Sequence, residues 1–304
     1  MTTTTTTPTI LTETELDDIY AFAIQLGKDA GKLLLEASQL RINSVSQSSS
    51  FFTEKDNSVD IVTKTDEDVE TFIKNAISAK YPHHAFIGEE TYSKSTTATS
   101  RPYLVSSDPT WVIDPLDGTI NYTHLVPFFC VSISFLVDGK PVIGVIQAPL
   151  LDQLFTSCKG RGAWLNQTQR LPLTRAPMPR SAPQGCIFAC EWGKDRRDVK
   201  DGNMYRKVES FLNMAAEAGG RDGKGGMVHG VRSLGSATLD LAYTAMGSFD
   251  IWWEGGCWEW DVAAGIAILE EAGGLVTTAN PPKDPETAEI EPIRLGSRLY
   301  LAIR

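Results

Sequence analysis

The sequence predicts an α/β protein whose helices and mixed, largely antiparallel sheets form a layered αβαβα sandwich. Two hairpin patterns carry this prediction. Residues 128–137 and 141–146 are rich in β-favouring side chains and flank Asp138-Gly139, a strong turn signal. A second strand pair follows at 154–158 and 163–165. Consecutive hairpins imply antiparallel pairing, and the helical segments around them supply the covering layers, which excludes a purely parallel arrangement.

Helices are predicted where apolar residues recur at helical spacing. The first spans about 13–39, and Thr12 with Glu15 resembles a capping box at its start. The second begins at Thr65-Asp66 and ends before Pro82. Further helices are expected at 204–218, at 235–246 and from Val262 to Ala272. Short strands are expected at 59–63, 85–88, 186–192 and 249–253. Polar loops are expected at 44–57, 221–230 and 281–292.

Composition narrows the class of protein. The 304 residues, 42% of them hydrophobic, are enough for a large core. A net charge of -10 without a basic stripe argues against nucleic-acid binding. The five cysteines form no CxxC pair, which suggests neither a zinc site nor a disulfide framework. Without a signal-peptide pattern or a membrane-length apolar segment, we expect a cytoplasmic protein that does not bind membranes.

The chain divides into a tail and two subdomains. Residues 1–10 contain a Thr run and are expected to be disordered. The segment 172–183, rich in Pro and Arg, is the best internal boundary. We therefore expect an N-terminal subdomain at 11–178 that binds metal and phosphate, and a C-terminal subdomain at 179–304 that binds substrate.

The segment 111–124, WVIDPLDGTINYTH, is the hardest to explain by packing alone. A short buried strand at 111–113 is expected to end at Asp114, because Pro115 fixes its own φ and Gly118 permits unusual backbone angles. Asp114 and Asp117 then converge on one side of the turn. Two adjacent carboxylates with a turn carbonyl suit a hard cation such as Mg²⁺. The alternative is an Asp-rich turn whose carboxylates only accept backbone hydrogen bonds.

This segment resembles the first signature of the inositol monophosphatase family of Mg²⁺-dependent, lithium-sensitive phosphatases. The segment 260–265, WDVAAG, resembles the second signature of that family. Two ordered motifs are more specific than either one alone, and the resemblance extends from about Leu16 to the end of the chain. It also includes fungal members, some of which accompany quinate metabolism. The resemblance implies a sugar-phosphatase-like fold, a small-molecule phosphate monoester as substrate, and a homodimer.

The resemblance also assigns roles to individual residues. Asp66 hydrogen-bonds Thr119, which orients the attacking water, and Glu89 joins the metal site, so that these three are the candidate catalytic residues. From sequence alone, Asp66 and Asp261 are better explained as helix caps, and Glu89 as a loop acid. Lys55 matches a lysine on a loop that closes over the metals, although a solvated charge cluster explains it equally well. The implied ligands of two or three Mg²⁺ ions are Glu89, Asp114, the Leu116 carbonyl, Asp117 and Asp261.

The same resemblance indicates where the substrate binds. The N–H groups of Gly118 and Thr119 would hold the phosphate at the start of a helix. Glu254 matches the acid that hydrogen-bonds sugar hydroxyls, and a carboxylate suits a polyol because it accepts several O–H bonds. The alternative for Glu254 is a loop acid. The full set of expected substrate contacts is Asp117, Gly118, Thr119, Gly235, Ser236, Ala237, Glu254 and Asp261.

Several functions remain compatible with these motifs. The favoured one is Mg²⁺-dependent hydrolysis of myo-inositol monophosphate by water. A 3'-phosphoadenosine 5'-phosphate nucleotidase is a rival, although Asn121-Tyr122 resembles the monophosphatase branch. A histidinol-phosphate phosphatase is another. From a different class, a catalytically silent regulator could retain the metal and phosphate site for binding alone, although such a protein is expected to have lost at least one ligand.

Overall fold

The computed structural model describes residues 11–43, 52–55, 58, 60–94, 105–280, 284, 286, 290 and 293–304. The predicted tail at 1–10 lies outside these residues. So do most of the predicted loops at 44–57 and 281–292.

A seven-stranded sheet dominates the first part of the chain, in the order β3-β4-β5-β6-β7-β8-β9. Its first two strands run parallel, and each later strand pairs antiparallel with its neighbour. The hairpin around Asp138-Gly139 is therefore confirmed. The strands are β3 (Ala85–Gly88), β4 (Thr110–Asp117), β5 (Cys130–Val137), β6 (Lys140–Ala148), β7 (Gln153–Cys158), β8 (Gly162–Leu165) and β9 (Gln169–Arg170).

A five-stranded sheet forms from the later part of the chain, in the order β11-β10-β12-β14-β13. Here β10 pairs parallel with β11 and β12, whereas β14 pairs antiparallel with β12 and β13. The strands are β10 (Ile187–Ala189), β11 (Gly230–Arg232), β12 (Ile251–Gly255), β13 (Leu275–Thr277) and β14 (Leu299–Ile303). A two-stranded sheet pairs β1 (Phe52–Glu54) with β2 (Ile61–Thr63).

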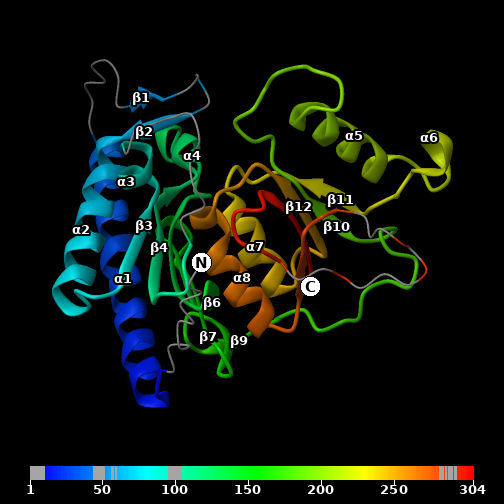
Figure 1. The fold of residues 1–304 in the computed structure, drawn as a ribbon. Coiled ribbons are helices and arrows are strands. Elements are labelled where there is room, and N and C mark those ends of the chain that lie inside the picture. Colours follow the sequence, from blue (N-terminus) through cyan, green and yellow to red (C-terminus); the bar gives the residue numbers. More distant parts are fainter. Residues whose placement is uncertain are drawn as a thin grey trace, which may run out of the picture.

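Helices separate and cover the sheets, as Figure 1 shows. Helices α1 (Glu13–Asn43) and α2 (Lys64–Lys80) contact the large sheet at β4, β5 and β6. Helices α7 (Ala237–Met246) and α8 (Glu259–Glu271) contact both sheets, and α5 (Asn203–Ala215) contacts β11. The predicted αβαβα order is thus confirmed. The remaining helical segments are α3 (Glu89–Lys94), α4 (Thr119–Thr123), the 3₁₀ turn η1 (Pro149–Leu151) and α6 (Gly220–Gly223).

Helix α8 packs closely enough on β6 to require glycine there. A Cβ built at Gly144 would lie 2.3 Å from the carbonyl oxygen of Ala264. The apolar residues Val262, Ala263 and Ile266 of this helix are at most 1% exposed. Because α8 is apolar on nearly all sides, it belongs in the middle layer, and its start is thereby fixed against the end of β4.

Several boundaries differ from prediction, among them the following three. The predicted loop at 44–57 contains strand β1, because residues 52–54 pair with 61–63. Strand β4 does not end at Asp114 but continues to Asp117, and a bulge between the two accommodates Pro115, which cannot donate to the ladder. Helix α8 begins at Glu259, so that Asp261 is its third residue and not its N-cap.

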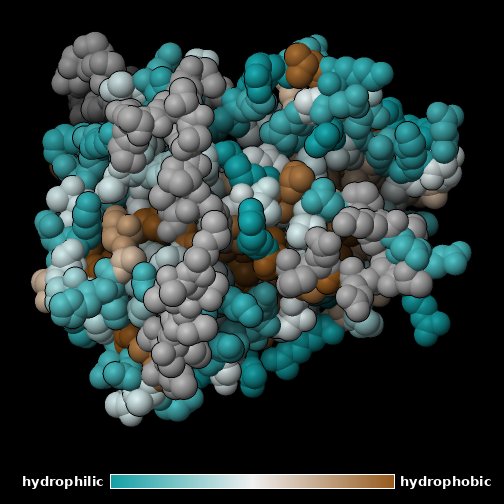
Figure 2. Space-filling view, in the orientation of Figure 1, coloured by the Kyte–Doolittle hydropathy of each residue, from teal (hydrophilic) through white to brown (hydrophobic). Residues whose placement is uncertain are grey.

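Among the described residues on the face in Figure 2, hydrophilic ones predominate, with smaller hydrophobic areas between them. Among the described residues, no helix is both long and apolar enough to span a membrane.

Candidate active site

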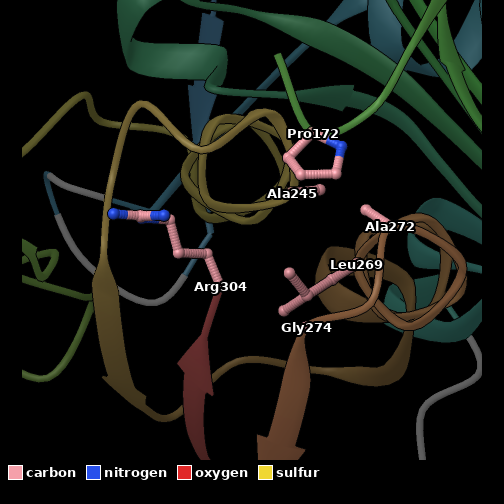
Figure 3. Close-up of a pocket in the computed structure, with 6 residues that line it drawn as sticks. All are labelled: Pro172, Ala245, Leu269, Ala272, Gly274 and Arg304. Carbon is pink, nitrogen blue, oxygen red and sulfur yellow. The ribbon is translucent and has the colours of Figure 1, made fainter. Parts of the chain in front are cut away.

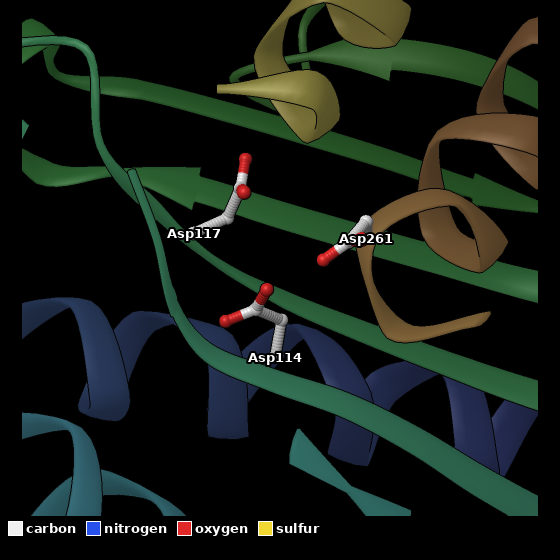
Figure 4. A group of neighbouring side chains, drawn as sticks. All are labelled: Asp114, Asp117 and Asp261. Atoms are coloured by element: carbon white, nitrogen blue, oxygen red, sulfur yellow. The ribbon is translucent and has the colours of Figure 1, made fainter. Parts of the chain in front are cut away.

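Three aspartates from two elements meet at the end of β4. Asp114 and Asp117 come from the bulged end of that strand, and Asp261 from the first turn of α8 (Figure 4). Each offers a carboxylate oxygen, and these oxygens all lie within 4.8 Å of one another. The bulge makes this possible, because without it residues three apart on a strand point to opposite faces.

Hydrogen bonds from the main chain and from a serine orient these carboxylates. Asp114 Oδ1 accepts the Leu116 N–H at 3.0 Å, and Asp261 Oδ2 accepts the Trp258 N–H at 2.6 Å. Asp117 Oδ2 accepts the Thr238 N–H at 3.0 Å and the hydroxyl of Ser236. One carboxylate oxygen of Asp261 therefore accepts a hydrogen bond at the start of its helix, and the other faces the cluster.

The cluster concentrates negative charge in a buried place. Burial, followed by the charges of Glu89, Asp117 and Asp261, raises the pKa of Asp114 well above its usual range. Burial and neighbouring acids raise the pKa of Asp117 to about 6 and that of Asp261 to about 8. Carboxylates that resist ionisation together are stabilised by a cation between them, and an all-oxygen donor set fits Mg²⁺. The residues present thus fit a hard divalent ion.

Glu89 borders this cluster and contacts two lysines. Its Oε1 lies 3.3 Å from Lys55 Nζ and 3.4 Å from Lys194 Nζ. Burial opposes ionisation of Glu89, but the charges of Lys194 and Lys55 outweigh it and lower the pKa. Lys55 also pairs with the buried Glu90 at 2.8 Å, so that it is not part of a solvated charge cluster. Lys194, which the sequence did not single out, therefore lies beside a candidate ligand.

Thr119 connects the cluster to α2. Its Oγ1 lies 3.2 Å from Asp66 Oδ1 and 3.1 Å from the Leu116 carbonyl oxygen, either of which can accept its single proton. Asp66 is 1% exposed, and its other oxygen accepts the N–H of Thr63 at 2.9 Å. Burial raises the pKa of Asp66 to about 6. The contact between Asp66 and Thr119 implied by the resemblance is present, while Asp66 also caps its helix.

Gly118 shapes the turn after β4. Its φ of 86° is left-handed, and a Cβ there would lie 2.7 Å from the carbonyl oxygen of Phe128. Both facts require glycine at this position. Gly118 precedes α4, so that the N–H groups of 118 and 119 follow directly after Asp117 in the chain.

One large pocket contains nearly all the predicted site residues. Its volume is about 580 Å³, within the range of small-molecule sites. Asp66 contacts the site through Thr119 and does not line the pocket. A second pocket of about 30 Å³, between Ala245, Leu269 and Arg304, has room for about one water molecule and is lined by no carboxylate (Figure 3). The predicted residues that line the large pocket are Glu89, Asp114, Leu116, Asp117, Gly118, Thr119, Gly235, Ser236, Ala237, Glu254 and Asp261.

Glu254 lies in the pocket wall but already has partners. Its Oε1 pairs with Lys207 Nζ and accepts the Gly255 N–H at 2.9 Å, and its Oε2 accepts the Glu191 N–H at 3.1 Å. Burial raises its pKa to about 7, although the charge of Lys207 opposes this. Glu191 in turn accepts the N–H of Gly235 at 2.9 Å. This network fixes two walls of the pocket.

Several residues in and around this pocket were not predicted from the sequence. Glu191 and Lys194 lie in the segment EWGKDR at 191–196, which begins at the end of the strand predicted at 186–192. A run of alternating charges at a strand end was the available signal. Lys207 does not line the pocket but pairs with Glu254, and it offered no signal, because a lysine on an amphipathic helix is usually solvated.

Comparison with known proteins agrees with this geometry. The model of the inositol monophosphatase family matches residues 15–299. The chain belongs to the inositol monophosphatase family. Among curated proteins, inositol monophosphatase 2 of Saccharomyces cerevisiae is 42% identical over 253 residues, which cover 83% of this chain and 79% of that protein.

Other members are similar over most of their length. Quinic acid degradation cluster protein x of Neurospora crassa is 73% identical over 300 residues, 96% of this chain and 88% of that protein. The solved inositol monophosphatase of Anabaena superposes with a TM-score of 0.70 at 29% identity, covering 95% of this chain and 91% of its own. Membership of this family supports phosphate monoester hydrolysis, and the family is generally Mg²⁺-dependent.

Proposed function

We propose that the protein hydrolyses the phosphate monoester of a small polyol, with myo-inositol monophosphate as the first candidate substrate. The observation that carries this proposal is the convergence of Asp114, Asp117 and Asp261 beside Thr119 in one pocket. Sequence similarity to the yeast inositol monophosphatase supports the same chemistry. The similarity to a protein named for quinic acid degradation extends the candidates to other polyol phosphates.

We assign metal binding to Glu89, Asp114, the Leu116 carbonyl, Asp117 and Asp261. Two or three bound Mg²⁺ ions would supply Lewis acidity for water activation and for the leaving oxygen. The protein positions the other parts. Asp66 accepts the Thr119 proton, so that the Thr119 oxygen can accept a proton from the water. The N–H groups of Gly118 and Thr119 hold the phosphate in line with that water.

The polyol would lie against the opposite wall. We assign the contact with the polyol to residues 235–237 and Glu254. Asp117 and Asp261 would lie between the polyol and the phosphate. The Glu254 carboxylate already accepts hydrogen bonds from Lys207 and from two main-chain N–H groups. Its remaining lone pairs can therefore accept hydrogen bonds only from hydroxyls that face the pocket. Glu254 thus selects hydroxyl donors at one edge of the substrate.

Measurement of phosphate release with and without Mg²⁺ tests this function. The substrates are myo-inositol 1-phosphate, histidinol phosphate and 3'-phosphoadenosine 5'-phosphate. We expect the inositol ester to react fastest among the three. Faster release from either rival substrate would contradict the polyol assignment, and no release from any of them would favour a silent binding protein. The homodimer stays a prediction, which analytical ultracentrifugation would test.

A further inference from the structure

Two arginine–tryptophan pairs line the large pocket. Arg298 lies over the ring of Trp258, with its Cζ 3.6 Å from the ring centre. Arg196 lies over the ring of Trp192 at 5.9 Å. Both are within the distance at which a cation is attracted by an aromatic face. These two pairs place positive charge on a pocket that also contains the acidic cluster.

Main-chain carbonyls hold both guanidinium groups in position. Arg196 Nε donates to the Gly193 carbonyl at 2.7 Å, and Arg298 Nη2 donates to the Gly256 carbonyl at 2.5 Å. Within the described part of the chain, neither forms a salt bridge with a carboxylate, whereas the adjacent Arg197 pairs with Asp195 at 2.8 Å. A guanidinium has five N–H donors, so that several remain for a ligand.

The ester phosphate does not account for these arginines. Its proposed position is beside Asp117 and Thr119, where the acidic cluster and the cation it would hold lie. The acids of the opposite wall do not account for them either, since Glu254 pairs with Lys207, and Glu191 accepts hydrogen bonds from Ser233 and Gly235. An arginine fork that lacks a carboxylate partner is suited to binding a planar carboxylate or a phosphate.

We propose that the preferred substrate is a polyol phosphate that carries a second anionic group, carboxylate or phosphate, bound by Arg196 and Arg298. This proposal rests on the hydrolase function proposed above. The pocket volume of about 580 Å³ leaves room for a ligand longer than a phosphate and a single sugar ring. Attraction between the two arginines and this second group would lower KM more than it would raise kcat, because it acts on the bound substrate and on the transition state alike.

The test compares matched esters. Glucitol 6-phosphate and 6-phosphogluconate differ only in a terminal hydroxymethyl or carboxylate, and glucitol 1,6-bisphosphate supplies the phosphate alternative. We expect kcat/KM to be at least about tenfold higher for one of the two anionic esters, through KM, which is typical of a charged hydrogen bond. The better anionic ester identifies the group. Equal values for all three would overturn the proposal.

Variants of Arg196 and Arg298 test whether these residues cause the preference for anionic esters. In Arg196→Gln/Arg298→Gln, the ratio of kcat/KM between anionic and neutral esters should fall at least about tenfold, close to one. Arg197→Gln is the control, because Arg197 neighbours Arg196 but does not line the pocket. A ratio unchanged in the double variant overturns the proposal, whereas failure of every ester, glucitol 6-phosphate included, would contradict hydrolysis itself. Circular dichroism confirms that each variant is folded.

Discussion

Lys207 and Glu254 form an ion pair in the wall of the pocket, with 0% and 2% of their side-chain surfaces exposed. Lys207 comes from α5 and Glu254 from β12, so that the pair joins the outer helix to the five-stranded sheet. Such a pair contributes little net stability compared with apolar residues, but removal of one partner leaves the other charge without compensation. The pair therefore couples folding to the arrangement of the substrate wall.

Lys207→Met should destabilise the protein by about 3 kcal/mol, because the Glu254 carboxylate stays buried and loses its counter-charge. Urea unfolding measures this loss. The double variant Lys207→Met/Glu254→Gln should recover most of it, since no charge is left buried. Equal stability of Lys207→Met and the wild type would contradict this account of the pair.

Thr119→Val should lower kcat by about 100-fold or more with little change in KM, because it removes the hydroxyl between Asp66 and Leu116. Thr119→Ser retains that hydroxyl and should retain most of the activity. Steady-state kinetics with myo-inositol 1-phosphate gives both values. Thr123→Val is the matched control on α4, since among the described residues the Thr123 hydroxyl bonds only to the Ile120 carbonyl. A fully active Thr119→Val enzyme would remove Thr119 from the mechanism.

Gly118→Ala should cost more stability than Gly160→Ala. Both glycines have positive φ, 86° and 77°, so that both variants pay a similar backbone penalty of about 1 kcal/mol. Only at Gly118 would the new Cβ meet a backbone oxygen, at 2.7 Å, whereas nothing lies within 4 Å at Gly160. Calorimetric melting of the two variants isolates the steric contribution. The same melting temperature for both would show that the turn can relax around the methyl group.

Without metal, stability should fall as pH rises. The folded protein holds the pKa of Asp261 at about 8 and that of Asp117 at about 6, against an ordinary value of 3.8. Between pH 3.8 and these values the folded state binds more protons than the unfolded state. The stabilisation of the folded state by these two carboxyls is therefore fully present below pH 3.8 and is lost as pH rises through the folded pKa values.

Mg²⁺ replaces those protons and should therefore raise the melting temperature more at about pH 8 than at about pH 6. Scanning calorimetry in EDTA and in saturating Mg²⁺ at both pH values measures the difference. Asp261→Asn should reduce it. An equal Mg²⁺ effect at both pH values would show that the clustered carboxylates do not exchange protons for metal.

Much of the fold follows from local patterns. Apolar spacing predicted α1 and α2, and Asp138-Gly139 predicted the β5–β6 hairpin, because these signals depend on neighbours in sequence. The predicted end of β4 at Asp114 was wrong, because a bulge allows the pairing with β5 to continue past Pro115. The N-cap role of Asp261 was wrong because the helix begins at Glu259, three residues before the predicted start, and Asp261 accepts the Trp258 N–H from the third helical position.

The metal side of the site could be predicted from the sequence more fully than the opposite wall of the pocket. The turn at 114–119 combines chemical and backbone signals in a few residues. The resemblance to the family, carried by this turn and by the segment at 260–265, supplied Asp261 and Asp66. Lys194, Lys207 and Arg298 were missed because their partners lie 47 to 134 residues away or are main-chain carbonyls. Contacts of that kind arise from packing of the two sheets and leave no local pattern.

Phosphate release from myo-inositol 1-phosphate during a Mg²⁺ titration tests the central claim most directly, with wild type, Asp114→Asn and the control Asp108→Asn measured side by side. Asp108 is exposed and lies before the start of β4. The account predicts saturable Mg²⁺ activation in the wild type and in Asp108→Asn, and loss of nearly all release in a folded Asp114→Asn. Release from Asp114→Asn that matches wild type at every Mg²⁺ concentration would contradict it.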